Sequence, residues 1–188
     1  MKIGTIASHS ALNIMSGARA EGFETVLFCP PERKEFYASF GFEDSIVTIQ
    51  SFDEVLEMSL DDVIMVPHGS FVAYIGAERL IQSDLKIFGS RKLMKWESDR
   101  NLKSKLLREA GLLVPREFDS IDNIDGPVIA KTHGAAGGKG YFIARNRDEA
   151  YEKMDPGVNY TFQEYIVGTK VFVTFFHSLA EDRLEIFG

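Results

Sequence analysis

A glycine-rich loop between two strand-like segments constrains this chain more than any other feature. Lys131 is followed at residues 132–140 by the run THGAAGGKG. Apolar β-type segments at residues 128–130 and 141–144 flank the run, so a strand, a flexible loop and a returning strand are expected to make a hairpin. Glycine admits positive φ and lets the backbone lie close to a ligand. Because exposed N–H groups beside cations suit phosphate oxygens, the loop predicts a phosphate site.

Two common glycine-loop signatures do not fit this stretch. A P-loop needs Ser or Thr after its Gly-Lys pair and then a helix, whereas Gly140 and Tyr141 follow Lys139 here. The dinucleotide-binding fingerprint joins a strand to a helix, whereas this loop is expected to join two strands. The alternative interpretation is a mobile surface hairpin that binds nothing.

Length and composition limit the classes of protein that this chain can belong to. The 188 residues suit one to two domains, and a hydrophobic content of 45% allows a real core. A formal net charge of −7 argues against a nucleic-acid binder, so a phosphate site must be a local cluster of cations. The single cysteine, Cys29, allows no internal disulfide, which either suits a reducing cytoplasm or is neutral, and its apolar surroundings predict an inert core residue. No stretch of about 18 apolar residues occurs, so no membrane span is expected.

The first half of the chain alternates strand and helix patterns. Short apolar strands are expected at residues 3–7, 25–29, 45–49, 63–66 and 86–88. Helices are expected at residues 11–21 and 77–82, and a capping box from Ser51 to Glu54 opens a short helix to Met58. Apolar strands separated by helices predict an α/β fold with a parallel sheet covered on both faces.

The second half changes to an α+β pattern. A helix is expected at about residues 99–110, an extended segment at 115–118, and a helix at 147–153 with Asn146 as its N-cap. Further strands are expected at residues 162–165, 170–176 and 184–187. The chain is therefore predicted to hold a Rossmann-like α/β domain over residues 1–90, a helical bridge and link over 91–126, and an incomplete glycine-loop subdomain over 127–188.

Two polar loops follow strands of the predicted parallel sheet. Residues 8–10, with His9 and Ser10, follow the first strand, and residues 67–70, with Ser70, follow the fourth. Open α/β sheets bind ligands beyond the carboxyl ends of their strands, so both loops are expected to line a pocket for a small phosphorylated molecule. The alternatives are ordinary helix capping by the serines, a solvated loop histidine and a plain turn.

Two further segments carry groups suited to a nucleotide. Arg100, at the start of the bridge helix, could direct a cation to the same phosphates as Lys131, although a lone arginine is more often a surface residue. The segment 162–168 places Gln163 and Glu164 between apolar residues, where a strand edge can offer backbone groups to an adenine. The alternative is an edge strand with solvated side chains.

Taken together, these residues resemble the ATP-grasp superfamily. The resemblance rests on residues 99–100, 108–115, the strand ending at Lys131 with its loop, and residues 163–168. That superfamily joins a carboxylate to an amine through an acyl phosphate made from ATP. The resemblance implies that Arg100 and Lys131 bind ATP phosphates. The ATP-binding residues that it further implies are Gly137, Gly138, Lys139 and Gly140 in a lid, and Gln163, Glu164 and Ile166 in an adenine slot.

A closer resemblance runs over nearly the whole chain. Segments 8–12, 17–23, 66–71, 96–100, 105–111 and 137–144 look like the archaeal formate-dependent 5-formaminoimidazole-4-carboxamide ribonucleotide synthetases. This resemblance implies ATP- and formate-dependent formylation of aminoimidazole carboxamide ribotide through formyl phosphate, a purine-biosynthesis step with magnesium or manganese as the metal. His9, Ser10 and Ser70 would bind the ribotide. The alternatives are another ATP-grasp carboxylate–amine ligase, a non-catalytic nucleotide- or ribotide-binding paralogue, and a fragment.

The chain departs from that family in its length. Members are longer, and their magnesium-binding acidic residues lie beyond the last residue here, so no metal ligand is named. We therefore expect a pre-ATP-grasp domain followed by an incomplete ATP-grasp domain, with weak or absent turnover by this chain alone. The resemblance implies formate and the ribotide as partners, a cytoplasmic location, and the homo-oligomers that are common among family members.

Overall fold

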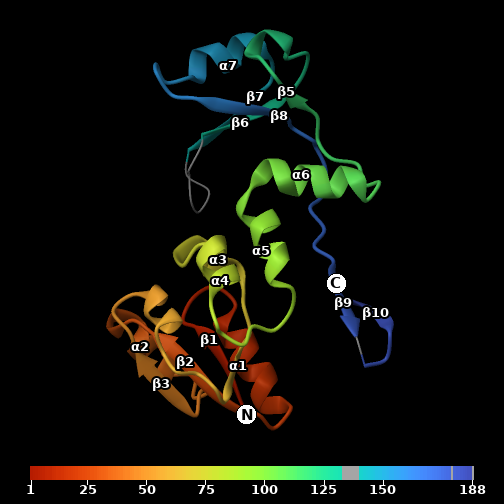
Figure 1. Ribbon diagram of the computed structural model, residues 1–188. Coiled ribbons are helices and arrows are strands. Elements are labelled where there is room, and N and C mark those ends of the chain that lie inside the picture. The colour runs from red at the N-terminus through yellow and green to blue at the C-terminus, as the bar shows by residue number, and fades with distance from the viewer. Residues whose placement is uncertain (133–139, 179, 188) are drawn as a thin grey trace. The chain divides into compact units, whose positions relative to one another are not determined.

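The computed structural model describes residues 1–132, 140–178 and 180–187. The chain forms two compact units, residues 1–112 and 113–188, whose elements are labelled in Figure 1. The helices at residues 91–112 belong to the first unit, and the three-part division at residues 90 and 126 stays a prediction. Among the described residues, no helix combines the length and the apolar character that crossing a membrane requires.

A four-stranded parallel sheet is the centre of the first unit. Its strands are β1 (Lys2–Ile6), β2 (Glu24–Cys29), β3 (Ser45–Thr48) and β4 (Val63–Met65). The strand order is β3-β2-β1-β4, and all three neighbouring pairs are parallel, which confirms the predicted sheet. The chain moves outward from β1 to β2 and β3 on one side and places β4 on the other. The carboxyl ends of β1 and β4 therefore form the switch point at which such sheets bind ligands.

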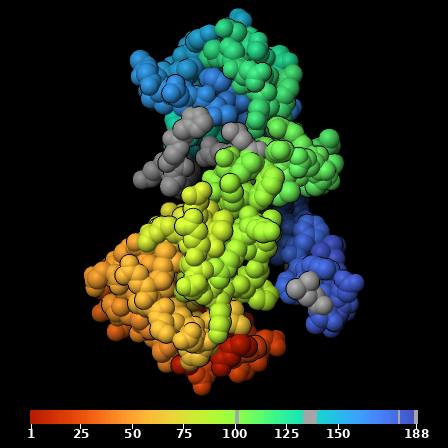
Figure 2. All heavy atoms as spheres, in the orientation of Figure 1, coloured from red at the N-terminus to blue at the C-terminus, as the bar shows by residue number. Residues whose placement is uncertain are grey.

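Helices cover both faces of this sheet. One face packs against α1 (Ala11–Ala20) and α2 (Pro31–Ala38), with Met15 and Leu27 fully buried between the layers. The other face, where Phe28 and Phe71 are fully buried, packs against the 3₁₀ helix η1 (Phe52–Leu56), α3 (Gly69–Tyr74), α4 (Ala77–Gln82) and α5 (Arg91–Ser98). Figure 2 shows α3, α4 and α5, in yellow to yellow-green, as one continuous surface.

Several local predictions differ from the structure. Helices α2, α3 and α5 were not expected, and the strand expected at residues 86–88 is only an isolated bridge between Met65 and Ile87. Pro31 occupies the first helical position of α2, where a missing N–H costs nothing, so the proline pair starts a helix as well as ending β2. The expected capping box of Ser51 and Glu54 is present and opens η1. Cys29 is buried, as expected for a core residue.

The last helix of the first unit is α6 (Arg100–Glu109), which matches the helix expected at residues 99–110. Asp99 accepts a hydrogen bond from the backbone N–H of Leu102 at 3.1 Å, and Gly111 follows the helix with φ of 76°. A carboxylate at the N-terminus and a glycine in the left-handed region after the C-terminus are the usual local signals for these two boundaries.

The second unit contains an antiparallel sheet of order β5-β8-β6-β7. Its strands are β5 (Glu117–Phe118), β6 (Val128–Thr132), β7 (Tyr141–Ala144) and β8 (Tyr160–Glu164). Helix α7 (Arg147–Lys153) and the 3₁₀ helix η2 (Ile121–Asn123) accompany it, and α7 contributes Ala150 to a core with Val128, Ala130 and Phe162. The predicted hairpin of β6 and β7 and the predicted cap at Asn146 are both confirmed.

A separate two-stranded antiparallel sheet follows in the chain. It pairs β9 (Thr174–Ser178) with β10 (Arg183–Phe187), in a register that sets Phe176 opposite Glu185. Strand β9 begins four residues later than the strand expected at residues 170–176, because the apolar segment Val171 to Val173 is not part of a strand. Both predicted strands are therefore present, with the first displaced toward the C-terminus.

Candidate functional site

The two polar loops of the first unit meet at the carboxyl ends of β1 and β4. The Ser70 hydroxyl donates to the Ser8 hydroxyl at 3.0 Å, although the two serines lie 62 positions apart in the chain. The rings of His9 and His68 are stacked, with centroids 6.2 Å apart. Because β1 and β4 are parallel neighbours, the structure confirms that both loops share one edge of the sheet.

His9 and Ser10 lie at the outer side of this edge. His9 has φ of 41°, a left-handed conformation that is unusual for a residue with a side chain and that clusters at ligand sites. Its Nδ1 atom lies 2.7 Å from the Ser10 hydroxyl oxygen, and the His9 ring is exposed. Ser10 occupies the N-cap position of α1 without a side-chain capping bond, so its hydroxyl is directed to His9. These contacts present an imidazole and a hydroxyl together.

His68 was not among the predicted site residues, and its role is to hold the loop. Its Nδ1 atom accepts a hydrogen bond from the Ser70 backbone N–H at 3.3 Å, and its Nε2 atom lies 3.1 Å from the Ile6 carbonyl oxygen. Burial lowers the pKa of His68, which keeps the ring neutral with Nε2–H as the donor. The N-cap position of His68 before α3 was the missed signal.

Arg33 and Tyr74 complete the polar edge and were also missed. The Arg33 guanidinium donates from Nη1 to the Ala7 carbonyl at 2.9 Å, at the end of β1. Hydrogen bonds from Arg33, and secondly from Ser8, lower the pKa of the Tyr74 hydroxyl. Nothing local in the sequence connects these residues, because they come from α2 and α3, two helices that the sequence pattern did not reveal.

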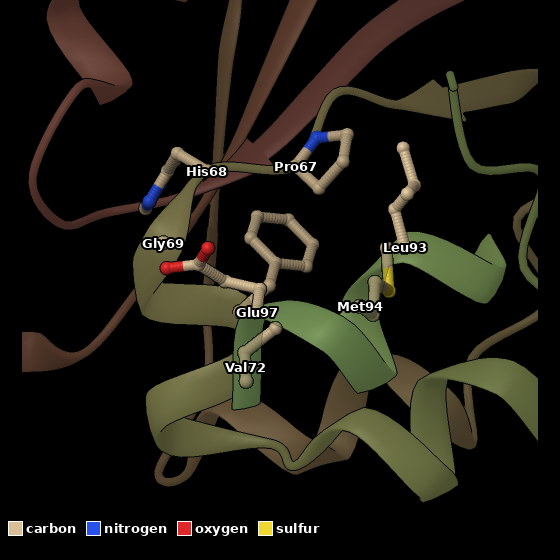
Figure 3. A pocket seen from close by; sticks show the side chains of 8 residues that line it. Pro67, His68, Gly69, Val72, Leu93, Met94 and Glu97 are labelled. Carbon is tan, nitrogen blue, oxygen red and sulfur yellow. The ribbon is translucent and has the colours of Figure 1, made fainter. Parts of the chain in front are cut away.

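A cavity of about 250 Å³ opens beside the His68 loop, between α3 and α5. Its lining is mainly apolar and consists of Pro67, His68, Gly69, Phe71, Val72, Leu93, Met94 and Glu97. Figure 3 shows the Glu97 carboxylate reaching from α5 toward Gly69. The cavity can accept a small planar group, with His68 and Glu97 as the titratable side chains in its wall.

In the second unit, the structure brings Lys131 and Gln163 together. The Lys131 Nζ atom donates to Gln163 Oε1 at 2.6 Å, from β6 to the neighbouring β8. The register pairs Ile129 with Gln163 and Lys131 with Thr161, so all four residues share one face of the sheet. That face lies opposite the α7 core. The predicted cation is therefore held in a fixed position on an open sheet face.

Glu164 and Ile166 take different directions from Gln163. Successive residues of a strand point to opposite faces, so the Glu164 side chain lies on the side of Phe162 rather than with Lys131. Its carboxylate accepts from the Arg116 backbone N–H at 3.1 Å, and its own N–H donates to the Arg116 carbonyl at 2.7 Å. Ile166 lies beyond the end of β8 with 62% of its surface exposed. The adenine-slot role of these residues stays a prediction.

The base of the glycine loop is closed by Thr132 and Gly140. The Gly140 carbonyl accepts from the Thr132 backbone N–H at 2.8 Å and from the Thr132 hydroxyl at 2.9 Å, and Gly140 has φ of 78°. The predicted lid residues Gly137, Gly138 and Lys139 lie outside the described residues. Arg100 opens α6, but its side chain also falls outside the described part of the structure.

The described residues do not offer a metal site. Within these ranges, no group of three or more histidine, cysteine, aspartate or glutamate side chains is placed to hold an ion. Magnesium prefers several oxygen ligands in near-octahedral geometry, which no described cluster provides. We therefore name no metal ligand among the described residues.

Solved structures resemble this fold. The crystal structure of "an IMP biosynthesis protein PurP" from Thermococcus kodakaraensis has a TM-score of 0.78 at 32% identity, over 98% of this chain and 57% of that one. The biotin carboxylase domain of the Hydrogenobacter thermophilus 2-oxoglutarate carboxylase, in complex with MgADP, ADP and bicarbonate, has a TM-score of 0.63 at 17% identity. It is matched over 88% of this chain and 44% of that one. The chain therefore shares its fold with these two proteins.

The family model described as "Protein of unknown function (DUF1246)" matches residues 3–118, and the chain belongs to that family. A 5-formaminoimidazole-4-carboxamide-1-(beta)-D-ribofuranosyl 5'-monophosphate synthetase of Ignicoccus hospitalis is 46% identical over the whole chain. The Saccharolobus solfataricus protein of the same name is 42% identical. The alignments cover 57% and 59% of these two relatives, so the chain spans little more than half of their length.

Proposed function

We propose that this chain carries the ribotide-binding and part of the ATP-binding region of an ATP- and formate-dependent ligase. The enzyme would formylate 5-aminoimidazole-4-carboxamide ribonucleotide in IMP biosynthesis. The observation that carries the proposal is the 46% identity, over the whole chain, to a protein named for the synthesis of the formylated ribotide. Assembly into a homo-oligomer and a cytoplasmic location belong to the same proposal.

The polar edge of the first unit supports the binding of the ribotide. His9, Ser10 and Ser70 present an imidazole and two hydroxyl groups where β1 and β4 end, at the switch point of the sheet. Hydroxyl groups can donate and accept, which suits both a ribose and a carboxamide. The apolar cavity beside Gly69 is large enough for a five-membered imidazole ring.

The open sheet face of the second unit supports the binding of ATP. Lys131 presents an ammonium group that the Gln163 amide orients, and an ammonium group can donate to phosphate oxygens. The hydrogen bond between Thr132 and Gly140 closes the base of the glycine-rich loop, and Thr132 directly follows Lys131 in the sequence. On this face of the sheet, Lys131 would bind the phosphate chain of ATP and Gln163 would lie near the adenine.

The chemistry of the proposed reaction follows from the weakness of formate as an electrophile. A formate oxygen attacks the γ-phosphorus of ATP, ADP leaves, and formyl phosphate is formed. The ribotide amine then attacks the formyl carbon, inorganic phosphate leaves, and the amine loses one proton. Lys131 would hold phosphate oxygens in line and offset the negative charge that develops on them, so catalysis is mainly positioning and electrostatic stabilisation. Magnesium would supply further charge neutralisation when bound.

Calorimetric titrations of the chain with ATP and with the ribotide test the proposal. We expect Ser70→Ala to weaken ribotide binding about 10-fold, with ATP binding retained, because one hydroxyl hydrogen bond is removed. Lys131→Ala should weaken ATP binding and retain ribotide binding. Formate-dependent ADP release is then measured with the full-length encoded protein. The proposal is contradicted if the wild-type chain binds neither ligand, or if ADP release needs no formate. ADP release that depends on acetate instead of formate would identify a different carboxylate–amine ligase.

A further inference from the structure

Arg33 extends from the first turn of α2 to the carboxyl end of β1, where none of the predicted site residues provides a permanent cation. We propose that Arg33 binds the phosphate group of a ribonucleoside 5′-monophosphate at this edge of the sheet. The inference rests on the proposed function, because it assigns the phosphate of the same ribotide to a particular side chain.

The Arg33 side chain is held in place before any ligand arrives. Its Nη1 atom donates to the Ala7 carbonyl at 2.9 Å, and its guanidinium carbon lies 5.4 Å from the Phe52 ring centroid and 5.9 Å from that of Tyr74. The two rings are themselves stacked, with centroids 4.9 Å apart. Such packing fixes the planar guanidinium, so less side-chain entropy is lost when it binds an anion.

Donors from the loop after β1 and from helices α2 and α3 converge around this guanidinium. Arg33 donates to the carbonyl of Ala7, which precedes Ser8, and its guanidinium carbon lies 5.9 Å from the Tyr74 ring centroid. Because Ser70 donates to Ser8, the four polar side chains lie together at the end of β1. An arginine has five N–H donors, and the three hydroxyl groups can each turn a proton toward an added acceptor. A tetrahedral phosphate accepts hydrogen bonds from several directions, which matches donors that come from the loop after β1, from α2 and from α3.

The charge balance around Arg33 also favours an anionic ligand. The chain has 28 acidic and 21 basic residues, and arginines such as Arg79 and Arg145 pair with carboxylates at 2.9 Å. Within the described ranges, Arg33 forms no ion pair with a carboxylate, and its partners there are the Ala7 carbonyl and the rings of Phe52 and Tyr74. An arginine that is half-buried without a counter-ion in an acidic chain is suited to an incoming anion.

The cluster is suited to one phosphate rather than to a triphosphate. Arg33 is the single permanent cation among the four side chains, and the other three are neutral hydroxyl groups. The nearby imidazole of His68 is kept neutral by burial. One guanidinium with neutral donors can neutralise and enclose a monophosphate, whereas a triphosphate needs several cations or a metal ion.

The test compares the ribotide with the corresponding riboside, which lacks the phosphate, by calorimetry on the chain. The wild-type chain should prefer the ribotide, and Arg33→Ala should reduce that preference about 10- to 100-fold, with riboside affinity unchanged within about twofold. Arg33→Lys should retain part of the preference, since it keeps the charge but loses the planar fork. Arg79→Ala is the matched control, because Arg79 is already paired with Asp53.

The outcomes separate this inference from the function on which it rests. If the wild-type chain binds neither compound, the proposed function fails. If the chain binds the ribotide and Arg33→Ala keeps the full preference, or loses riboside affinity equally, the inference alone is overturned. Thermal unfolding of each variant shows whether it folds. Should Arg33→Ala not fold, Arg33→Lys and Tyr74→Phe decide, because the lysine keeps a long cationic side chain beside Phe52 and the phenylalanine keeps the ring that stacks on it. An unaltered preference in both would then overturn the inference.

Discussion

The Lys131 Nζ atom lies 2.6 Å from Gln163 Oε1, across two neighbouring strands of the second unit. The two residues are diagonal partners in the ladder, since Gln163 stands opposite Ile129. An amide oxygen orients the ammonium group but carries no charge to cancel it. This contact therefore fixes the direction of the Lys131 ammonium group on this face of the sheet, where it can donate to a phosphate oxygen.

Replacing Lys131 by alanine should weaken ATP binding about 10- to 100-fold, because charge-assisted hydrogen bonds to phosphate oxygens are lost. The dissociation constant from calorimetry checks this. Lys153→Ala is the control, because the Lys153 ammonium group forms an ion pair with Glu149 and donates a hydrogen bond to the Ile143 carbonyl. Equal affinities for ATP in the wild-type chain and Lys131→Ala would remove Lys131 from the ATP site.

The sequence predicted those parts of the fold that depend on local patterns. The hairpin around the glycine loop, the cap at Asn146 and the parallel sheet all follow from spacing and composition over a few residues. The meeting of Ser8 and Ser70 was also predictable, because adjacent parallel strands must bring their following loops together.

The parts that were missed depend on contacts between distant residues. Arg33 donates a hydrogen bond to the Ala7 carbonyl, 26 positions away in the chain, and no local sequence pattern predicts this contact. Helix α3 spans six residues and begins at a glycine, so it gave no clear helical periodicity. The contact between the Glu164 carboxylate and the Arg116 backbone N–H spans 48 positions and has no local signal either, while the adenine-slot role of Glu164 stays a prediction.

His68 should make the stability of the first unit depend on pH. Burial lowers its pKa below the usual value, so the folded state favours the neutral ring and the unfolded state binds the proton more readily. Stability is then complete above about pH 6.5 and falls as the pH drops from there toward the lowered pKa. His68→Gln, whose amide can still donate and accept, should flatten this part of the profile.

Urea titrations at several pH values between about 5 and 8 measure the effect of His68. His177→Gln is the control, because His177 lies in β9 of the second unit and not beside His68. It should keep the dependence of the wild-type chain. A profile that is equally steep in His68→Gln and in the wild-type chain would show that the buried ring is not its source.

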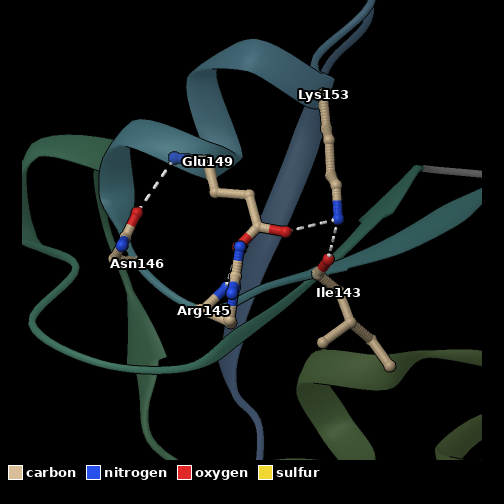
Figure 4. Close-up of polar contacts among 5 residues, drawn as sticks. All are labelled: Ile143, Arg145, Asn146, Glu149 and Lys153. Atoms are coloured by element: carbon tan, nitrogen blue, oxygen red, sulfur yellow. Dashed lines mark hydrogen bonds and ion pairs between the residues drawn. The ribbon is translucent and has the colours of Figure 1, made fainter.

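Glu149 should contribute stability to the second unit at neutral pH but not in strong acid. Figure 4 shows its carboxylate between Arg145 and Lys153, and hydrogen bonds from Lys153, then Arg145, lower the pKa of Glu149 to about 2. This contribution is present above the ordinary value of 4.5 and is lost as the pH falls toward about 2. Glu149→Gln should therefore unfold more readily at pH 7, and the difference should vanish near pH 2. Thermal unfolding followed by circular dichroism tests this, with Glu152→Gln on the same helix as the control.

Two glycines of the first unit should respond in opposite ways to alanine. A Cβ atom on Gly4, in β1, would lie 2.6 Å from Val63 Cγ1 and 2.9 Å from Met65 Sδ. The core must shift to accept it, so Gly4→Ala should destabilise the chain by about 1–3 kcal/mol. Gly17 lies inside α1 with nothing within 4 Å of the same atom, so Gly17→Ala should stabilise by about 0.5–1 kcal/mol through the higher helix propensity of alanine. Free energies of unfolding from urea titrations measure both changes, and a neutral Gly4→Ala would mean that the packing of β1 against β4 is looser than these distances require.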